Sequence, residues 1–172
     1  MPSLILGPVT GLATNRPALH FASVASQSLS SSGALVVPQT LAASFIIDNV
    51  NTAAQQSIFF DGAGIQMGMD NSGTANQAFI WAAGATASVA ASDASWHAFI
   101  DTFAGSSSEI YIDGAANAVS SPGTNGFNGN VSLGIAGGGQ PYNGNLVEGG
   151  VWPSAISNKS GLNSNQHSYW GF

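Results

Sequence analysis

Cysteine and charge are the two things that this sequence has least of. Its 172 residues contain no cysteine, which excludes disulfides, thiolate metal sites and cysteine catalysis. Only 6% of the residues are Asp, Glu, Lys or Arg, whereas ordinary domains have about 25%. Lys and Arg together number two, Arg16 and Lys159, and the formal net charge is −6. We therefore expect neither nucleic acid nor an anionic membrane as a partner, because binding phosphates takes several cations.

Long apolar runs are also missing. No stretch approaches the 18 or so apolar residues of a membrane span, and the first residues lack the basic region of a signal peptide. These absences, together with a surface rich in Ser, Thr, Asn and Gln, favour a bacteriophage virion protein. Such a protein is made in the host cytoplasm and then released from the cell. A secreted protein is the alternative.

The chain does contain many short apolar runs, separated by Gly, Asn, Ser and Asp every eight to twelve residues. This rhythm predicts an all-β fold, with two antiparallel sheets in a single β-sandwich domain over residues 1–172. The expected strands are Leu4–Val9, Ala18–Ser23, Ala34–Val37, Ala42–Asn49, Ser57–Asp61, Ile65–Met69, Ala78–Ala82, Thr86–Ala91, Trp96–Phe103, Glu109–Ile112, Val131–Ala136 and Leu146–Val151.

The stretch from Glu109 to Gly114 gives the clearest strand orientation. Ile110 and Ile112 share one face and must point to the core, since each contributes about 1.5–3 kcal/mol when buried. Glu109, Tyr111 and Asp113 then share the outer face. Asp113-Gly114 predicts a hairpin turn, because both residues tolerate positive φ. The same dipeptide chemistry predicts turns at Asp61-Gly62, Asn128-Gly129 and Asn143-Gly144.

The two ends of the chain leave alternatives open. Residues 1–17 are either an arm that adds a strand to a neighbour or an edge strand of the same sandwich. Residues 153–172 form an irregular or short helical tail, for which Ser157 or Ser160 is the expected cap. We expect this tail to pack its apolar side chains on the sandwich, and the alternative is an exposed aromatic docking patch. Those side chains are Leu162, Tyr169, Trp170 and Phe172.

Several segments, taken in order, carry a family resemblance. They are Trp96-His97, Phe103–Ser106, Glu109–Gly114, Val131–Gly137 and Tyr142–Trp152. In this order the chain resembles the laminin-G-like, concanavalin-A-like lectin/glucanase superfamily. The resemblance implies a jelly roll whose loops and concave face bind glycans or proteins.

Glycoside hydrolysis is not expected, although the resemblance includes glucanases. Retaining hydrolysis needs two carboxylates about 5–5.5 Å apart. Glu109 and Glu148 fall on different expected strands, and Glu109 and Asp113 are about 13 Å apart along one strand. A nucleophile elbow of the form Gly-x-Ser-x-Gly is absent, and the histidines are scattered. We therefore predict a protein that is not an enzyme.

Glycan binding needs an aromatic platform beside amide groups. Tyr142 and Trp152 flank loops, with Asn143 and Asn145 nearby, and these four are the predicted ligand-binding residues. Trp81 and Trp96 lie inside apolar strands and are expected to fill the core.

No cofactor is required by this sequence, but the resemblance implies calcium as an option. Asp61, Asp70 and Asn71 are the candidate ligands, since loop oxygens suit this ion. A role in forming turns explains the same residues without a metal.

The leading hypothesis is a structural or binding subunit of a bacteriophage particle, such as a capsid decoration, tail or fibre protein. Its expected partners are other virion proteins or further copies of itself, with a glycan as a further candidate. The alternative is a secreted or surface lectin-like carbohydrate-binding module, and a glycoside hydrolase is the distant third.

Overall fold

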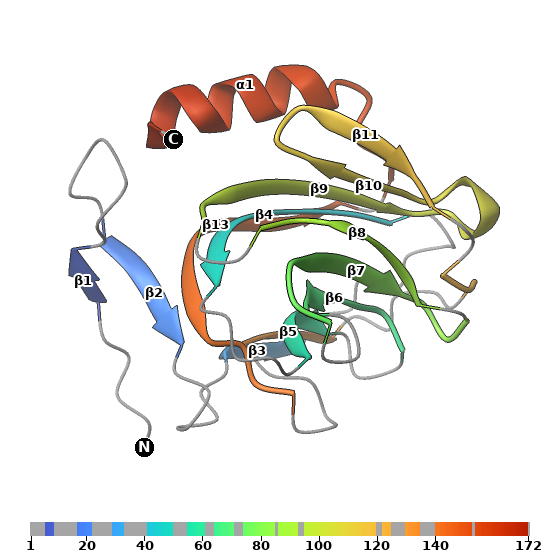
Figure 1. Cartoon of the computed structure of the whole chain (residues 1–172), viewed down its shortest axis with the longest axis horizontal. Helices are drawn as coiled ribbons and strands as arrows, with labels where there is room; N and C mark the ends of the chain where they lie inside the picture. Colours follow the sequence, from blue (N-terminus) through green and yellow to red (C-terminus); the bar gives the residue numbers. More distant parts are fainter. Residues whose placement is uncertain are drawn as a thin grey trace.

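A computed structural model shows two antiparallel β-sheets and one C-terminal helix (Figure 1). It describes residues 6–8, 17–21, 29–32, 41–49, 55–60, 64–70, 74–84, 86–92, 95–119, 122–124, 130–134, 140–152 and 154–171. The predicted two-sheet sandwich is confirmed. No helix in these ranges is long and apolar enough to cross a membrane.

The larger sheet has seven strands in the order β1-β2-β13-β4-β9-β10-β11. Their bounds are β1 Leu6–Pro8, β2 Pro17–Phe21, β4 Leu41–Asn49, β9 His97–Phe103, β10 Glu109–Ile112, β11 Ala115–Ala118 and β13 Gly144–Trp152. β1 is at one edge, where it pairs with β2. β4 is central, between β13 and β9, as its Phe45-Ile46-Ile47 run indicates.

The smaller sheet has six strands in the order β3-β12-β5-β6-β7-β8. Their bounds are β3 Leu29–Ser32, β5 Gln56–Phe60, β6 Gln66–Met69, β7 Gln77–Trp81, β8 Ala87–Ala90 and β12 Asn130–Leu133. β3 was not among the predicted strands, and the strand predicted at Ala34–Val37 lies outside the described residues. The predicted turns Asp61-Gly62 and Asn128-Gly129 also lie outside them.

The core lies between the sheets and is formed by the inward side chains of both. Ile80 and Phe59 come from the smaller sheet, and Phe99 and Ile110 come from the larger one. All four are fully buried. Ile112 belongs to the same cluster, so the predicted inward orientation of the two isoleucines is confirmed.

Two predicted turns have different outcomes. Asp113 and Gly114 have φ of 48° and 88°, which is the double positive φ of a hairpin turn, and they connect β10 to β11. The prediction for Asn143-Gly144 is wrong. Gly144 is the first residue of β13 and pairs with strands on both sides, so the chain does not reverse there.

Helix α1, Lys159–Trp170, covers the outer face of the larger sheet (Figure 1). Its cap is Asn158, whose side chain accepts from the amide of Gly161, and not Ser157 or Ser160. The helix ends at Gly171, which has φ of 77°. Trp170 packs on the sheet as predicted, but Tyr169 is 52% exposed. Phe172 lies outside the described residues.

Candidate functional site

A hollow of about 260 Å³ opens on the smaller sheet. Among the described residues, its lining comprises one aromatic ring, three amide side chains and one hydroxyl. These are Trp81, Gln55, Gln66, Gln140 and Thr86. None of the five side chains carries a charge.

The pairing of β6 with β7 sets the floor of this hollow. Gln66 lies directly opposite Trp81, so both side chains are on the same face of the sheet. Their neighbours Met67 and Ile80 belong to the core cluster, and side chains alternate along a strand. Gln66 and Trp81 therefore point away from the core.

The turn after β7 holds the indole of Trp81 in place. Its Nε1–H donates to the carbonyl of Gly84 at 2.9 Å. The amides of Ala82 and Gly84 both donate to the carbonyl of Pro122, at 2.7 and 2.9 Å. A Cβ on Gly123 would lie 1.8 Å from the carbonyl oxygen of Ala82. This close approach requires glycine at position 123.

A network of amide groups fixes the other wall. Nε2 of Gln66 donates to Oε1 of Gln140 at 2.7 Å and to the hydroxyl of Ser57. Ser57 also donates to Oε1 of Gln140 at 3.3 Å. Gln140 reaches this site from a segment 74 positions away from Gln66. The amides are thus oriented before any ligand arrives.

This arrangement suits a ligand that has one apolar face and several hydroxyl groups. The face of an indole stacks on apolar C–H surface, while its polar edge finds a hydrogen-bond partner. Amide side chains both donate and accept hydrogen bonds. Ligand sites generally combine an aromatic or apolar lining with a few well-placed polar groups.

A model of the concanavalin A-like lectin/glucanases superfamily matches residues 21–160 of the chain. The chain belongs to this superfamily. No curated protein matches the sequence.

Solved structures with this fold share it at low sequence identity. Domain 4 of AbnA, an extracellular arabinanase of Geobacillus stearothermophilus, was solved in complex with arabinotriose; it is 12% identical, with a TM-score of 0.67 over 93% of this chain and 80% of that one. A heptameric pentraxin of Limulus polyphemus is 14% identical, with a TM-score of 0.57 over 79% and 73%. The binding domain of botulinum neurotoxin DC, in complex with SialylT, is 12% identical, with a TM-score of 0.58 over 95% of this chain and 44% of that one.

The structure does not gather the four predicted ligand residues into an open site. Tyr142 is 1% exposed and belongs to the core cluster, where its hydroxyl donates to the carbonyl of Asn145 at 3.1 Å. Its ring therefore packs in the core of this structure, and a ligand-binding role for Tyr142 stays a prediction. The amide N–H of Asn143 donates to Gln56 at 2.8 Å. Trp152 is 38% exposed and folds back over Gly150 on the larger sheet.

Sequence reasoning did not single out the polar residues of the hollow, and it expected Trp81 in the core. The alternation of apolar and polar residues along these two strands could have identified Gln66 and Trp81 as outward-facing. Gln66 is an odd number of positions from Met67 and Met69, so it lies on the opposite face of its strand. Trp81 is four positions from Gln77 and lies on the same face of its own strand. Pairing these two runs as a hairpin places Gln66 and Trp81 on one outward face. The expectation that Trp96 lies in the main core also changes, because it packs with Trp170 near the helix.

Of the predicted calcium ligands, only Asp70 lies in the described part of the chain. It is fully buried, and its Oδ2 accepts from Nε2 of Gln56 at 2.8 Å. It therefore links the end of β6 to β5 and does not face solvent. Asp61 and Asn71 lie outside the described residues. Within the described ranges, no three His, Asp or Glu side chains are grouped as a metal site would require.

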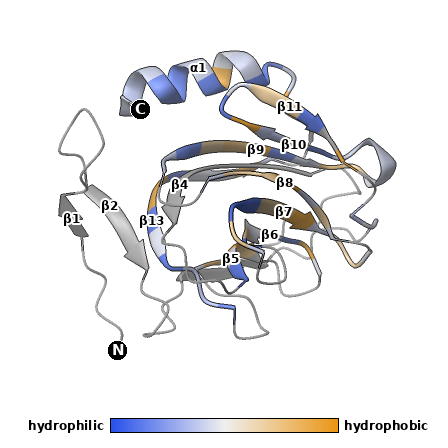
Figure 2. Ribbon diagram, in the orientation of Figure 1, coloured by the Kyte–Doolittle hydropathy of each residue, from blue (hydrophilic) through white to orange (hydrophobic). Residues whose placement is uncertain are grey.

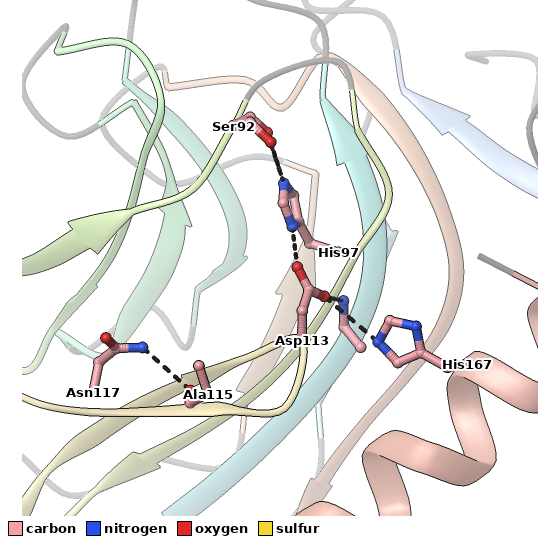
Figure 3. A network of polar contacts seen from close by, with 7 residues as sticks. Ser92, His97, Asp113, Ala115, Asn117 and His167 are labelled. Carbon is pink, nitrogen blue, oxygen red and sulfur yellow. Dashed lines mark hydrogen bonds and ion pairs between the residues drawn. The ribbon is translucent and has the colours of Figure 1, made fainter.

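Ser92, His97 and Asp113 form a network that the sequence did not predict (Figure 3). Nδ1 of His97 lies 2.6 Å from Oδ2 of Asp113, as in a catalytic triad. However, Nε2 lies 2.7 Å from the carbonyl oxygen of Ser92 and 3.3 Å from its hydroxyl. The two ring nitrogens thus lie against the carboxylate of Asp113 and the carbonyl oxygen of Ser92, both of which are acceptors. Nε2 therefore lies closer to the carbonyl oxygen of Ser92 than to its hydroxyl, unlike the contact between base and nucleophile in a triad.

Three described carboxylates on the outer side of the larger sheet contact helix α1. Glu109 pairs with Lys159 at 2.5 Å. Oδ1 of Asp113 accepts from the amide of Ala98 at 2.8 Å and lies 3.7 Å from Nε2 of His167. The two oxygens of Glu148 accept from Gln166 and Trp170, both at 2.9 Å. Figure 2 shows that α1 is mostly hydrophilic along its length, so its attachment to the sheet depends on such polar contacts.

Proposed function

We propose that the chain is a carbohydrate-binding module without catalytic activity, and that the hollow at Trp81 holds the glycan. One observation carries this proposal. An indole that is held by its own N–H stands beside three amide side chains in an open hollow. The apolar face of a sugar can stack on the ring while its hydroxyl groups bond to the amides.

The structural relatives give independent support. The arabinanase domain was solved with arabinotriose and the neurotoxin domain with SialylT. At 12% identity these likenesses concern the fold alone. They support the lectin-like alternative of the sequence analysis over its leading hypothesis.

The placement of the carboxylates supports the non-enzymatic part of the proposal. Glu109, Asp113 and Glu148 bond to helix α1 or to His97, and Asp70 and Asp101 are buried. None of these five lines the hollow. Retaining and inverting hydrolysis both need a pair of carboxylates across the scissile bond.

A glycan array tests this proposal. We expect the wild-type chain to bind at least one class of oligosaccharide, and Trp81→Ala to lose that binding by about tenfold or more, equivalent to ~1.4 kcal/mol. Trp152→Ala is the matched control, because it removes an exposed tryptophan from the other sheet and should bind like the wild type. Binding that survives Trp81→Ala and fails in Trp152→Ala would place the site elsewhere.

The wider setting of such a module stays a prediction from the sequence. A virion component could carry it, with other virion proteins or further copies of the chain as partners, and so could a secreted protein. Calcium at Asp61 and Asn71 is a prediction of the same kind.

A further inference from the structure

The amide of Gln66 has only one hydrogen-bonding atom left for a ligand. Its Nε2 carries two hydrogens, and these are directed to Oε1 of Gln140 and to the hydroxyl of Ser57. The side chain is 6% exposed, so its orientation is constrained. What it offers in the hollow is its acceptor, Oε1.

The side-chain amide of Gln140 complements that of Gln66, because it offers donors to a ligand. Its Oε1 accepts from both Gln66 and Ser57, which leaves the two N–H groups of its Nε2 as donors. The hollow therefore presents an acceptor and a donor on two amides that are bonded to each other. Two hydroxyls on adjacent carbons of a sugar ring match this pair, since one can donate to Gln66 while the other accepts from Gln140.

The described lining of the hollow provides no cation to compensate an ionised ligand. Its five lining side chains are all neutral, and the chain has a net charge of −6. The described lysine, Lys159, is paired with Glu109 on the outer face of the larger sheet. A carboxylate that entered the hollow would lose water without gaining a cation, which is costly.

We infer that the Gln66–Gln140 amide pair makes this site selective for uncharged sugars with adjacent hydroxyl groups, and that it rejects uronic and sialic acids. This inference rests on the proposed function. It adds the class of ligand and the two residues that determine the selectivity, whereas Trp81 supplies affinity for any sugar ring.

Matched pairs of oligosaccharides that differ only at carbon 6 provide the test, measured by isothermal titration calorimetry. The pairs are cello-oligosaccharides with β-1,4-linked glucuronic acid oligomers, manno-oligosaccharides with mannuronic acid oligomers, and carboxyl-reduced oligogalacturonides with the unreduced ones. Arabinotriose is a further neutral probe, and sialyllactose a further acidic one. We expect the neutral member of any bound pair to bind at least about tenfold more tightly.

Gln140→Glu is the informative variant, because it keeps the size of the side chain and replaces its donor with a charged acceptor. We expect it to lose neutral-sugar binding by about tenfold or more. Asn117→Asp makes the same change in charge on β11, outside the hollow, and should bind as the wild type does. Thermal unfolding of both variants checks that they are folded.

Each result bears on a different claim. Equal binding of neutral and acidic members would overturn the selectivity and leave the proposed function standing. Unchanged binding by Gln140→Glu would overturn the role of the amide pair. Absence of binding to every probe would count against the proposed function and the inference together.

Discussion

The indole N–H of Trp170 donates to Oε2 of Glu148 at 2.9 Å, which ties the last turn of α1 to β13. The bulge between Leu146 and Glu148 makes this contact available. Leu146 packs in the core between the sheets, whereas Val147 packs with Trp170 and Glu148 bonds to the same helix. Two consecutive residues thus face α1, as a β-bulge allows.

Glu148 should therefore be a main anchor of α1. Glu148→Ala leaves two donors, on Gln166 and Trp170, without their acceptor, and each costs about 1–3 kcal/mol. We expect the free energy of unfolding, measured in urea, to fall by about 2–4 kcal/mol. Lys159→Met is the control, because its ion pair with Glu109 is partly exposed and should contribute about 1 kcal/mol or less. Equal losses in the two variants would contradict this account.

Asp101 should make stability depend on pH. It is 1% exposed, and within the described residues its Oδ1 has no hydrogen-bond partner. Burial raises the pKa of this carboxyl well above its ordinary value; Lys159 opposes the shift and Glu109 adds to it. Below about pH 4 both folded and unfolded states hold the proton. As the pH rises, the unfolded state releases it first, so the folded state loses stability until its own pKa is passed.

Asp101→Asn removes this titration. We expect the stability of the wild type relative to Asp101→Asn to decline from about pH 4 upward and then to level off. Urea unfolding of both proteins at a series of pH values measures the difference. If the two curves stay parallel across the range, the carboxyl does not titrate as burial requires.

Gly123 should be essential to the turn that holds Trp81. It has φ of 118°, and an added Cβ would lie 1.8 Å from the carbonyl oxygen of Ala82. We expect Gly123→Ala to destabilise the fold by about 3 kcal/mol or more, since it adds a clash to the usual ~1–3 kcal/mol of a strained backbone. Glycan binding should weaken as well, because the Gly84 carbonyl that holds the indole moves with this turn.

Gly105→Ala is the matched control for backbone conformation. Gly105 also has positive φ, 59°, but an added Cβ would meet only the methyl group of Thr124 at 3.6 Å. It should cost about 1 kcal/mol and leave glycan binding unchanged. A similar loss in both variants would mean that the contact with Ala82 does not matter.

Strands with clear alternation could be predicted from the sequence, and those without it could not. Ile110 and Ile112 fixed the orientation of β10, because turning Glu109 and Asp113 inward would have been costly. β11 and β3 were missed because Ala115–Ala118 and Leu29–Ser32 contain hardly any of the β-branched and aromatic residues that mark strands. Helix α1 was predicted only as an alternative, since its sequence has weak helix formers and hydrogen bonds to the sheet hold it.

The candidate site could be predicted only in its chemistry. Aromatic and amide groups were expected to form a glycan site, but Tyr142 packs in the core whereas Trp81 lines the hollow. Strand alternation places Trp81 on the same face as Gln66, whereas the indole is held by the turn at Gly84, which bonds to Pro122 in a segment outside this hairpin. Gln140 comes from a distant loop, and no local pattern links it to Gln66.

The most direct test of the central claim is a titration with a bound neutral oligosaccharide, followed by NMR of side-chain N–H groups. We predict that the largest shifts occur at the indole N–H of Trp81 and at the side-chain amides of Gln66 and Gln140. The indole of Trp152 and the amides of Asn143 and Asn145 should change little. Shifts centred on Trp152 and Asn145, with Trp81 unmoved, would contradict the claim that the glycan lies in the hollow.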